Sequence, residues 1–492
     1  MDIRTKSWIA ASVATGLTAA SSGVIAADDF SPYTATATGS QPEAVVIGDI
    51  NNDGKNDVIL TTSYANDPEN DFKLFVFIQD DNGALSPAVK YSTQASYVSR
   101  PTSVDIADLN SDGLMDVVVG EAGSGIEIFY QDEAGELSTS SLITTPFSLR
   151  IRAGDLNGDG MADLAGIGWG GSEAGVFLQN DNGTLDFSAG YFAPHGGYDD
   201  LELGDINNDG MTDIVVMSGQ SYSFDNLAVL PQQSDGTFSD VMFYDLGGNE
   251  TTGGLGIGDI NGDQLSDVVV SYGGNSPSSN IAIFAQSSPG VLDQPVSLAS
   301  YDIPESLDIA DVTADQHADV IVLHGEWLRL GVYEQLTDGS LAAEALYPIP
   351  YASHYNPHGL AVGDINSDGM ADVVIADSNN GLVTLLNKNQ PLPPANELPV
   401  SNAGEDRVTR TRRISLLDGT DSYDPDGSLV AYDWYQLSGS PVRFYPTSTP
   451  GIVLFRAPRM THDDRDELVF ELTVTDDDGA TDTDEVRIQV VR

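Results

Sequence analysis

The 492-residue sequence predicts an all-β protein, with a seven-bladed β-propeller followed by a C-terminal β-sandwich. The main observation is an acidic segment of nine residues that recurs seven times, at intervals of 47 to 59 residues. Strand-like apolar runs flank each copy. Repeats of about 40–50 residues with four strands each are typical of propeller blades, whereas helical repeats would show a period of about 3.6 residues. After residue 400 the repeat is lost, and short strand-like pieces alternate with turns, which predicts a sandwich.

Five copies of the acidic segment follow one pattern, Asp-x-Asn-x-Asp-Gly-x-x-Asp, and they begin at Asp49, Asp108, Asp155, Asp205 and Asp364. The copy that begins at Asp259 has Gln264 at the sixth position, where the pattern has Gly. The copy that begins at Asp311 has Gln316 there and Thr313 in place of Asn. A residue other than Gly that is forced into the left-handed backbone region costs about 1–2 kcal/mol. Both altered loops should therefore bind a cation less well, and the loop at Asp311 is either a weak site or a plain turn.

The residue types in this segment indicate a calcium site. Side-chain oxygens at the first, third, fifth and ninth positions, with the carbonyl of the seventh, suit a cation that takes about six to eight oxygens. Gly at the sixth position allows the sharp turn. Asp, Asn and Gly are also ordinary turn residues, but seven copies in one register favour metal binding. The sequence predicts Ca²⁺ at the five intact loops and up to seven ions in the ring.

The predicted ligands, loop by loop, are Asp49, Asn51, Asp53, Lys55 and Asp57; Asp108, Asn110, Asp112, Leu114 and Asp116; Asp155, Asn157, Asp159, Met161 and Asp163; Asp205, Asn207, Asp209, Met211 and Asp213; Asp259, Asn261, Asp263, Leu265 and Asp267; Asp311, Asp315 and Asp319; and Asp364, Asn366, Asp368, Met370 and Asp372.

A second repeat predicts how the ring closes. A turn followed by a large apolar residue, such as Asp-Gly-Thr before Phe238, lies between successive acidic segments and indicates a hairpin before the fourth strand. Residues 30–38 resemble the strand that follows this hairpin, while the seventh repeat has only three strands of its own. We therefore expect residues 30–38 to pair beside residues 382–388, which would close the ring and remove a sheet edge.

The acidic segments and their flanking strands resemble the FG-GAP/VCBS repeats of the integrin α-subunit propeller and of many secreted bacterial proteins. The resemblance covers residues 30–388. It implies that the acidic loops lie on one face, joining the innermost strand of each blade to the next, and that ligands meet the opposite face. It implies no particular activity, because such propellers occur in binding modules and in some enzymes.

The remaining segments predict the domain boundaries. Residues 1–26 have a basic start, an apolar stretch and a small-residue cleavage site, as in a secretory signal peptide. The propeller is expected over residues 27–390 and a Pro-rich linker over residues 391–399. Residues 400–492 resemble a PKD-like, immunoglobulin-type domain, with Trp434 in the core between its sheets. A group of acidic residues in that domain has two possible interpretations, another calcium site or a solvated acidic turn. These residues are Asp424, Asp426, Asp476, Asp477 and Asp478.

Amino-acid composition restricts which partners the protein can bind and in which compartment it is expected. The chain has 75 acidic and 20 basic residues, a net charge of −55 and no cysteine. Such a field repels nucleic acid and anionic membranes, and no later apolar run reaches the length of about 18 residues that a membrane span needs. We expect the protein to be secreted, periplasmic or on the cell surface, and not to insert into a membrane. We also expect calcium ions, rather than disulfide bonds, to cross-link it.

The sequence contains no GxSxG, HExxH, phosphate-binding Gly-rich loop or Cys nucleophile. Two functions stay open. The favoured one is a calcium-dependent recognition or adhesion protein that binds an extracellular glycan or protein surface. The alternative is a propeller-fold polysaccharide lyase acting on uronic acids, with the candidate catalytic residues His195, Tyr198, Arg100 and His358. For His358 a purely structural place at the entry to its blade is the competing interpretation.

Overall fold

The computed structural model contains two compact units, Met1–Pro391 and Leu392–Arg492, and each is considered by itself. The structure describes residues 24–25, 29–168, 173–192, 198–218, 226–246, 251–350, 356–389, 398–460, 465–477 and 479–492. Among these residues no helix is long and apolar enough to cross a membrane.

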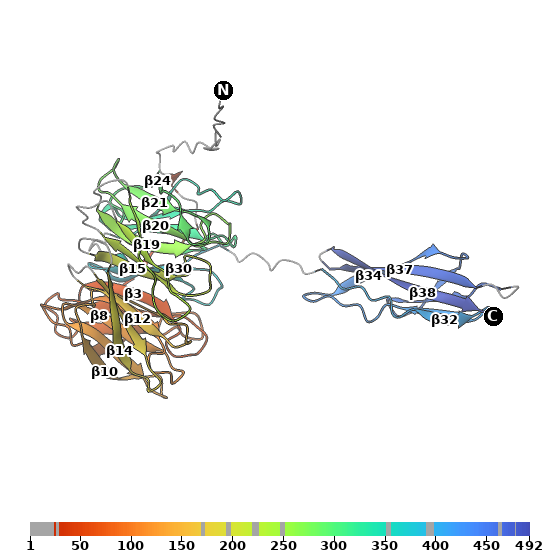
Figure 1. Ribbon diagram of the computed structural model, residues 1–492, viewed down its shortest axis with the longest axis horizontal. Coiled ribbons are helices and arrows are strands. Elements are labelled where there is room, and N and C mark those ends of the chain that lie inside the picture. The colour runs from red at the N-terminus through yellow and green to blue at the C-terminus, as the bar shows by residue number, and fades with distance from the viewer. Residues whose placement is uncertain are drawn as a thin grey trace, which may run out of the picture. The chain divides into compact units, whose positions relative to one another are not determined.

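In the described part of the first unit, seven blades of four antiparallel strands are named here in chain order, and the sheet of blade 6 also includes a fifth strand (Figure 1). Blade 1 contains β3 (Pro42–Gly48), β4 (Asp57–Thr62), β5 (Lys73–Phe77) and β6 (Val89–Ser92). Blade 2 contains β7 (Arg100–Ala107), β8 (Asp116–Ala122), β9 (Gly125–Gln131) and β10 (Leu137–Thr144). Blade 3 contains β11 (Arg150–Gly154), β12 (Asp163–Ile167), β13 (Glu173–Gln179) and β14 (Leu185–Phe192).

Blade 4 contains β15 (Tyr198–Gly204), β16 (Asp213–Ser218), β17 (Leu227–Leu230) and β18 (Met242–Tyr244). Blade 5 contains β19 (Thr252–Gly258), β20 (Asp267–Tyr272), β21 (Asn280–Phe284) and β24 (Val296–Ala299), with a small ribbon of β22 (Gln286–Ser288) and β23 (Val291–Leu292). Blade 6 contains β25 (Leu307–Ala310), β26 (Asp319–His324), β27 (Arg329–Tyr333) and β28 (Ala345–Pro348), with the 3₁₀ helix η1 (Gly325–Trp327). Blade 7 contains η2 (Pro357–Gly359), β29 (Leu360–Gly363), β30 (Asp372–Asp377), β31 (Gly381–Leu385) and β2 (Thr34–Thr36).

The first strands of the blades surround a common axis. β3, β7, β11, β15, β19, β25 and β29 contact one another in this order, and β29 contacts β3 in turn. The sheets therefore form a closed ring, which confirms the predicted seven-bladed propeller.

The N-terminal strand closes this ring. β2 pairs antiparallel with β31, with Thr34 opposite Thr384 and Thr36 opposite Leu382, and Phe30 bridges to Asn387. The predicted pairing of residues 30–38 beside residues 382–388 is confirmed. Blade 7 is thus built from both ends of the propeller, which leaves its third strand paired on both sides.

Ahead of this strand, β1 (Val24–Ile25) pairs parallel with β28 of blade 6. Residues 1–23 and 26–28 lie outside the described residues. The signal peptide over residues 1–26 stays a prediction.

Apolar side chains fill the space between blades. Successive residues of a strand point to opposite faces, so Ile59 of β4 packs toward blade 2 while Val58 and Leu60 pack toward blade 7. Seven clusters of buried residues occupy the seven blade interfaces in this way. This two-sided burial explains why the second strands are continuous apolar runs in the sequence.

The second unit is a β-sandwich, as predicted. One sheet contains β32 (Arg407–Arg410), β38 (Thr481–Val491), β37 (Asp466–Asp476) and β34 (Leu429–Ser438), and the other contains β33 (Ile414–Asp418), β36 (Ile452–Arg456) and β35 (Phe444–Pro446). Trp434 is buried in the core between them, and its Nε1 donates to the carbonyl of Gly451 at 2.9 Å. The expected core role of Trp434 is confirmed.

Candidate functional site

Each acidic loop joins the first strand of a blade to the second, as the resemblance implied; the loop Asp49–Asp57, for example, joins β3 to β4. Loop positions 1 to 9 are counted from the first Asp. In the first loop the backbone N–H of Asp53, at position 5, donates to Oδ1 of Asp49 at 3.0 Å and to Oδ1 of Asn51 at 2.9 Å. One N–H therefore draws the oxygens of positions 1 and 3 together. The position-6 N–H of Gly54 donates to Oδ2 of Asp49 at 2.7 Å.

The same convergence recurs around the ring. The position-5 N–H donates to both oxygens in the loops that begin at Asp108, Asp155, Asp205, Asp259 and Asp364. In the loop at Asp311 only the position-1 carboxylate accepts this N–H, because Thr313 replaces Asn. The Oγ1 of Thr313 is buried and has no hydrogen-bond partner among the described residues.

Position 6 is left-handed in every loop, including the two that lack Gly. Gly54 has a φ of 83°, Gln264 one of 68° and Gln316 one of 69°. A Cβ at Gly54 would meet no atom within 4 Å. The cost of Gln at this position is therefore conformational and not steric, and the predicted strain at Gln264 and Gln316 has its structural basis in this backbone conformation.

Position 9 is buried in all seven loops. In the first loop Asp57 accepts the N–H of Ile50 through Oδ2 at 3.2 Å and the N–H of Gln79 through Oδ1 at 2.8 Å. The carboxylate thus fastens the loop to the end of the third strand. Burial, opposed by these two hydrogen bonds and reinforced by the charges of Asp53 and Asp49, raises the pKa of Asp57 to about 6.

The partner of position 9 was missed from the sequence. It is an amide residue at the end of the third strand. In four repeats, at Gln79, Gln131, Gln179 and Asn387, its side chain also bonds to the neighbouring blade. Gln179 Nε2 donates to the carbonyls of Ala162 in its own blade and Asp108 in blade 2, both at 3.0 Å. Asn387 Nδ2 does the same with Ala371 and Val312. The sequence signal was an amide at one place in every repeat: Gln79, Gln131, Gln179, Gln232, Gln286, Gln335 and Asn387.

The donor set of the intact loops fits calcium. Two carboxylates and an amide oxygen converge at positions 1, 3 and 5, and a third carboxylate lies at position 9, close enough for its pKa to be raised by the first and fifth. A cation that prefers oxygen ligands would relieve this repulsion. Calcium at these loops remains a prediction.

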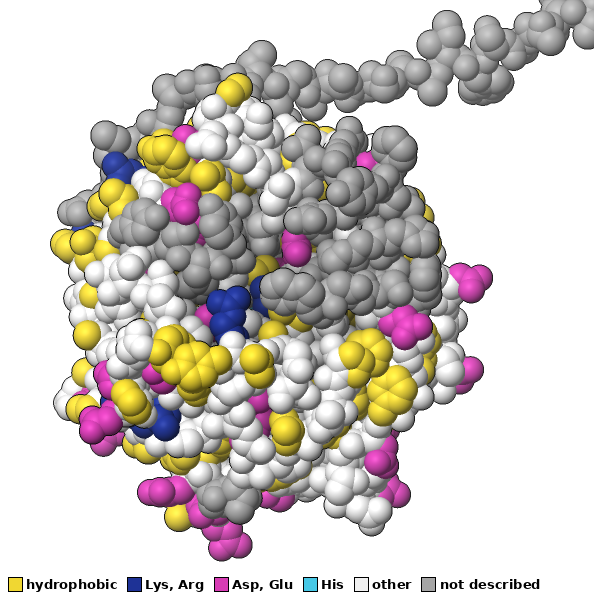
Figure 2. Space-filling view, turned by 90° about the vertical axis from the view of Figure 1, so that its left-hand side faces the viewer, with side chains coloured by type: hydrophobic (Ala, Val, Ile, Leu, Met, Phe, Trp, Pro, Cys, Tyr) yellow, Lys and Arg dark blue, Asp and Glu magenta, His cyan; other side chains and the backbone are white. Residues whose placement is uncertain are grey.

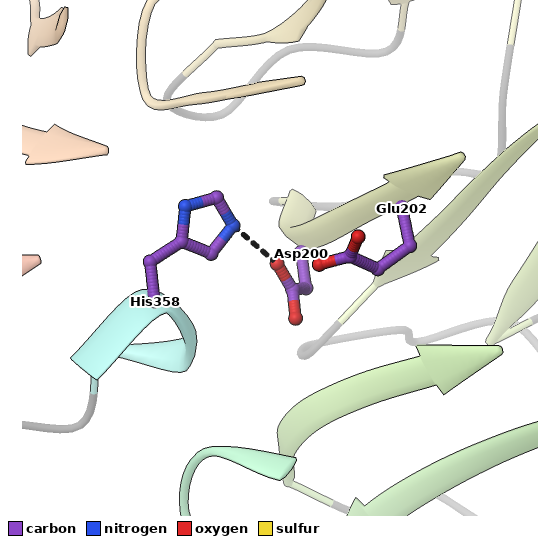
Figure 3. Close-up of side chains that lie close together, drawn as sticks. All are labelled: Asp200, Glu202 and His358. Atoms are coloured by element: carbon purple, nitrogen blue, oxygen red, sulfur yellow. Dashed lines mark hydrogen bonds and ion pairs between the residues drawn. The ribbon is translucent and has the colours of Figure 1, made fainter. Parts of the chain in front are cut away.

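A second cluster lies where the first strands meet the ring axis. Asp200 and Glu202 extend from β15, and His358 extends from η2 of blade 7; Figure 3 shows the three side chains together. Their ligand atoms lie within 4.8 Å of one another, the only such group of three or more Asp, Glu, His or Cys residues among those the structure describes. Asp200 and His358 are buried, and His358 Nε2 lies 3.1 Å from Asp200 Oδ1.

Arg152 of β11 determines the chemistry of this cluster. Its Nε donates to Glu202 at 2.9 Å, and its Nη1 lies 2.9 Å from Nδ1 of His358. Since a guanidinium only donates, Nδ1 of His358 must accept, so its proton is on Nε2 and points at Asp200. Burial and then the charges of Arg152 and Arg150 hold the pKa of His358 well below its ordinary value of 6.5.

This arrangement does not fit a metal ion. A metal on Nε2 would require the proton on Nδ1, where the imidazole would lose the hydrogen bond from Arg152. The guanidinium is already the cation that the carboxylates face. We interpret the cluster as a polar network with a structural role.

The axial carboxylates also connect the blades. Asp105 accepts the N–H of Ala153 at 2.8 Å, Asp200 that of Leu255 at 3.1 Å, and Asp308 that of Val362 at 3.0 Å, each from the first strand of the following blade. Burial raises the pKa of Glu202 and of Asp308 to about 7. In four blades, a charged residue near the axis lies three positions before the first Asp of the acidic loop. These residues are Asp105, Arg152, Glu202 and Asp308.

Of the four lyase candidates, only Arg100 and His358 have described side chains, and the structure does not join these two. Arg100 is exposed and pairs with Glu43 at 3.3 Å, and no hydrogen bond or ion pair joins it to the buried His358. The side chains of His195 and Tyr198 lie outside the described residues. Figure 2 shows the face of the first unit where acidic side chains lie mostly toward the edge, with Lys or Arg side chains near its centre.

In the acidic turns of the second unit, two carboxylates accept hydrogen bonds from backbone N–H groups of the same unit. Asp477 Oδ1 accepts the N–H of Ser428 at 2.6 Å, and Asp476 Oδ1 accepts that of Ala480 at 2.7 Å. Asp424 has no hydrogen bond to its carboxylate oxygens among the described residues, and Asp478 lies outside them. Both interpretations of this turn stay open.

Comparison with protein families finds the FG-GAP-like repeat at residues 49–119, 108–166, 155–216, 205–270 and 311–375. A PKD-domain family matches residues 403–490. Comparison with curated proteins gives no match.

Among solved structures, the PKD domain from the KIAA 1837 protein is 21% identical, with 20% of this chain and 92% of that chain covered and a TM-score of 0.17. A periplasmic gluconolactonase of Pseudomonas aeruginosa is 13% identical, with 64% and 98% covered and a TM-score of 0.42. A nucleoside hydrolase-related protein of Saccharophagus degradans is 22% identical, with 20% of this chain and 26% of that chain covered and a TM-score of 0.17. The family matches extend over more than half of the residues, and the chain belongs to the family of FG-GAP-like repeat proteins, with a PKD domain after its propeller.

Proposed function

We propose that the protein is a secreted, calcium-binding recognition protein whose propeller presents a face to an extracellular glycan or protein. FG-GAP-like repeats and a PKD domain are of the extracellular type, which supports secretion. The observation that carries calcium binding is the convergence of the position-1 and position-3 oxygens on one N–H in each of the five intact loops, beside two further carboxylates.

Calcium would act on stability, not on chemistry. When bound, it neutralises three carboxylates per loop and adds metal–oxygen bonds between segments of one blade. The residues of the chain supply the rest. Position 9 fastens each loop to the end of the third strand, and in four repeats the amide residue there also joins neighbouring blades. A folded ring with ligand-bound loops is a rigid support for a recognition face.

The burial and the hydrogen bonds of His358 favour recognition over lyase activity. A lyase needs a base that reaches a substrate, whereas His358 is buried and its two nitrogens are occupied by Asp200, Ser103 and Arg152. Its side chain is only 1% exposed. These contacts support a structural role.

The test is a glycan and extracellular-protein binding screen of the full chain, with calcium and after chelation. Binding to a defined ligand that is lost on chelation and restored by calcium would support the proposal. Incubation with polyuronates tests the alternative, because β-elimination creates an unsaturated sugar that absorbs ultraviolet light. Turnover without stable binding would overturn the recognition function.

A further inference from the structure

The second unit differs from the rest of the chain in where its basic residues lie. Residues 400–492 contain 10 of the 20 basic residues, all of them arginines. The whole chain has a net charge of −55. A surface where arginines gather without acidic partners is therefore unusual in this protein.

The outer face of the three-stranded sheet β33–β36–β35 carries such arginines, while Asp418, which has the same outward register at the end of β33, accepts hydrogen bonds from Thr420. Ile414 lies opposite Arg456, and Leu416, Leu454 and Tyr445 lie opposite one another across the three strands. Residues directly opposite in a sheet share a face. The alternate residues Leu417 and Phe455 are buried in the core, so the first set faces outward.

Arg443 belongs to the same face. It lies one residue before Phe444, which pairs with Phe455, and its guanidinium carbon is 5.5 Å from the centroid of the Tyr445 ring. Six of the outward residues are called the basic face: Ile414, Leu416, Arg443, Tyr445, Leu454 and Arg456.

The basic face is exposed and unpaired. Ile414 is 64% exposed and Tyr445 49%. Arg443 and Arg456 are also exposed, and no ion pair involves either of them within the described part of the chain. Backbone hydrogen bonds from Arg412 to Ala457 and from Ala457 to Arg413 place two further exposed arginines at the same end of this sheet.

We propose that the basic face binds an extended polyanionic glycan, whose sugar rings carry carboxylate or sulfate groups. An arginine fork bonds such groups in a bidentate way, and the Tyr ring with the flanking Leu and Ile side chains suits the apolar face of a sugar ring. Strands about 4.8 Å apart repeat these donors at short intervals. A linear glycan offers one ring and one charge per unit, which matches this pattern.

Charge directs such a ligand to this face. A polyanion is repelled by the acidic remainder of the chain and attracted only where arginines lack partners. A folded acidic protein would need a larger area of matched shape than a small open sheet provides. The inference concerns the second unit and does not require calcium in the first, so failure of one leaves the other standing.

The experiment measures binding of fluorescent oligogalacturonate and dextran sulfate to the full chain at several salt concentrations, with neutral dextran as the control ligand. The test variant is Arg443→Ala with Arg456→Ala. We expect its affinity for the anionic glycans to fall about tenfold or more, since each lost fork is a charge-assisted contact. The slope of log affinity against log salt should fall by about 2, because two ion contacts are gone.

The matched control is Arg487→Ala on the other sheet, since Arg487 is 56% exposed and already paired with Glu485. It should bind like the unaltered protein. The conservative variant Arg443→Lys with Arg456→Lys keeps the charge but not the fork and should lie in between. Intrinsic tryptophan fluorescence, to which the buried Trp434 contributes, checks that the variants remain folded.

Four results would overturn the proposal, and three of them concern glycan binding. They are equal affinity of the double Ala variant, equal binding of neutral dextran, and equal loss in the Arg487→Ala control. A fourth is salt-sensitive self-association that the double variant abolishes without any effect on glycan binding; the partner of the face would then be a second copy. Preference between oligogalacturonate and dextran sulfate decides which anion the face takes.

Discussion

Arg152 and His358 are 206 residues apart in the chain, yet Nη1 of the arginine lies 2.9 Å from Nδ1 of the histidine at the axis of the propeller. The arginine extends from blade 3 and the histidine from blade 7. Their contact fixes the imidazole tautomer and keeps the histidine neutral. It also links blade 3 to blade 7 across the axis, in addition to the apolar contacts between neighbouring blades.

Loss of the Arg152 guanidinium should be costly. Arg152→Met would leave Glu202 without its paired guanidinium beside Asp200 and Asp105. Both side chains of the pair are 22% exposed, so the cost should lie between that of an exposed pair, about 0–1 kcal/mol, and that of a fully buried pair, about 3–5 kcal/mol. Urea unfolding in saturating calcium measures the change. Arg100→Met is the matched control, because Arg100 is exposed and its pair should contribute about 0–1 kcal/mol. Equal effects of the two substitutions would contradict the proposed weight of the axial network.

Calcium removal should lower the melting temperature. Metal that binds only the folded state adds stability by mass action, and without it three carboxylates in each intact loop repel one another. The measurement is thermal unfolding with calcium, with excess EDTA, and with EDTA followed by excess calcium. Magnesium replacing calcium is the control for ionic strength. A melting curve that EDTA leaves unchanged would exclude a structural role for the ions.

The loops at Asp259 and Asp311 should lose calcium first. Their position-6 residues Gln264 and Gln316 adopt φ values of 68° and 69°, and Thr313 removes one oxygen ligand. Gln316→Gly with Thr313→Asn should strengthen the site and raise stability at limiting calcium, because the left-handed strain of about 1–2 kcal/mol is removed. Hydrogen exchange during a calcium titration follows each blade. Blade 6 protected as early as blade 3, or a double variant with unaltered affinity, would show that position 6 does not control binding.

A buried carboxyl group should make stability depend on pH. Glu305 is 4% exposed, its Oε1 has no hydrogen bond among the described residues, and burial raises its pKa from 4.5 to about 8. The folded protein binds the proton more tightly than the unfolded one, so this group's contribution falls as the pH rises from about 4.5 to about 8. Glu305→Gln should remove that decline and gain stability relative to the unaltered protein at pH 8.

Urea unfolding at pH 5, 6.5 and 8 in saturating calcium tests this, because calcium limits titration of the loops. The exposed Glu334 supplies the matched control as Glu334→Gln, which should keep the pH profile of the unaltered protein. Parallel profiles for Glu305→Gln and the unaltered protein would contradict the expected ionisation.

The sequence alone was enough for the local and periodic features. The repeat at Asp49 and its six counterparts predicted blades, Phe30–Thr38 predicted closure, and Trp434 predicted a sandwich core. Each of these depends on short-range geometry: alternation along a strand, a turn that needs a left-handed residue, or one missing strand in a repeat. The structure bears out these expectations, while the calcium ligands stay predictions.

Only the tertiary structure decided what the charged residues near the axis do. His358 and Arg152 lie in different repeats, and their contact depends on ring closure, which brings seven first strands to one axis. The sequence offered His358 as a catalytic candidate because its residue type suits proton transfer. Burial and a neighbouring guanidinium, which no local pattern specifies, turn it into a neutral structural group. The basic face of the second unit was also not predicted from the sequence, because it depends on strand pairing between distant segments. The pairing of β33, β36 and β35 brings Ile414, Arg456 and Arg443 to one side of the sheet.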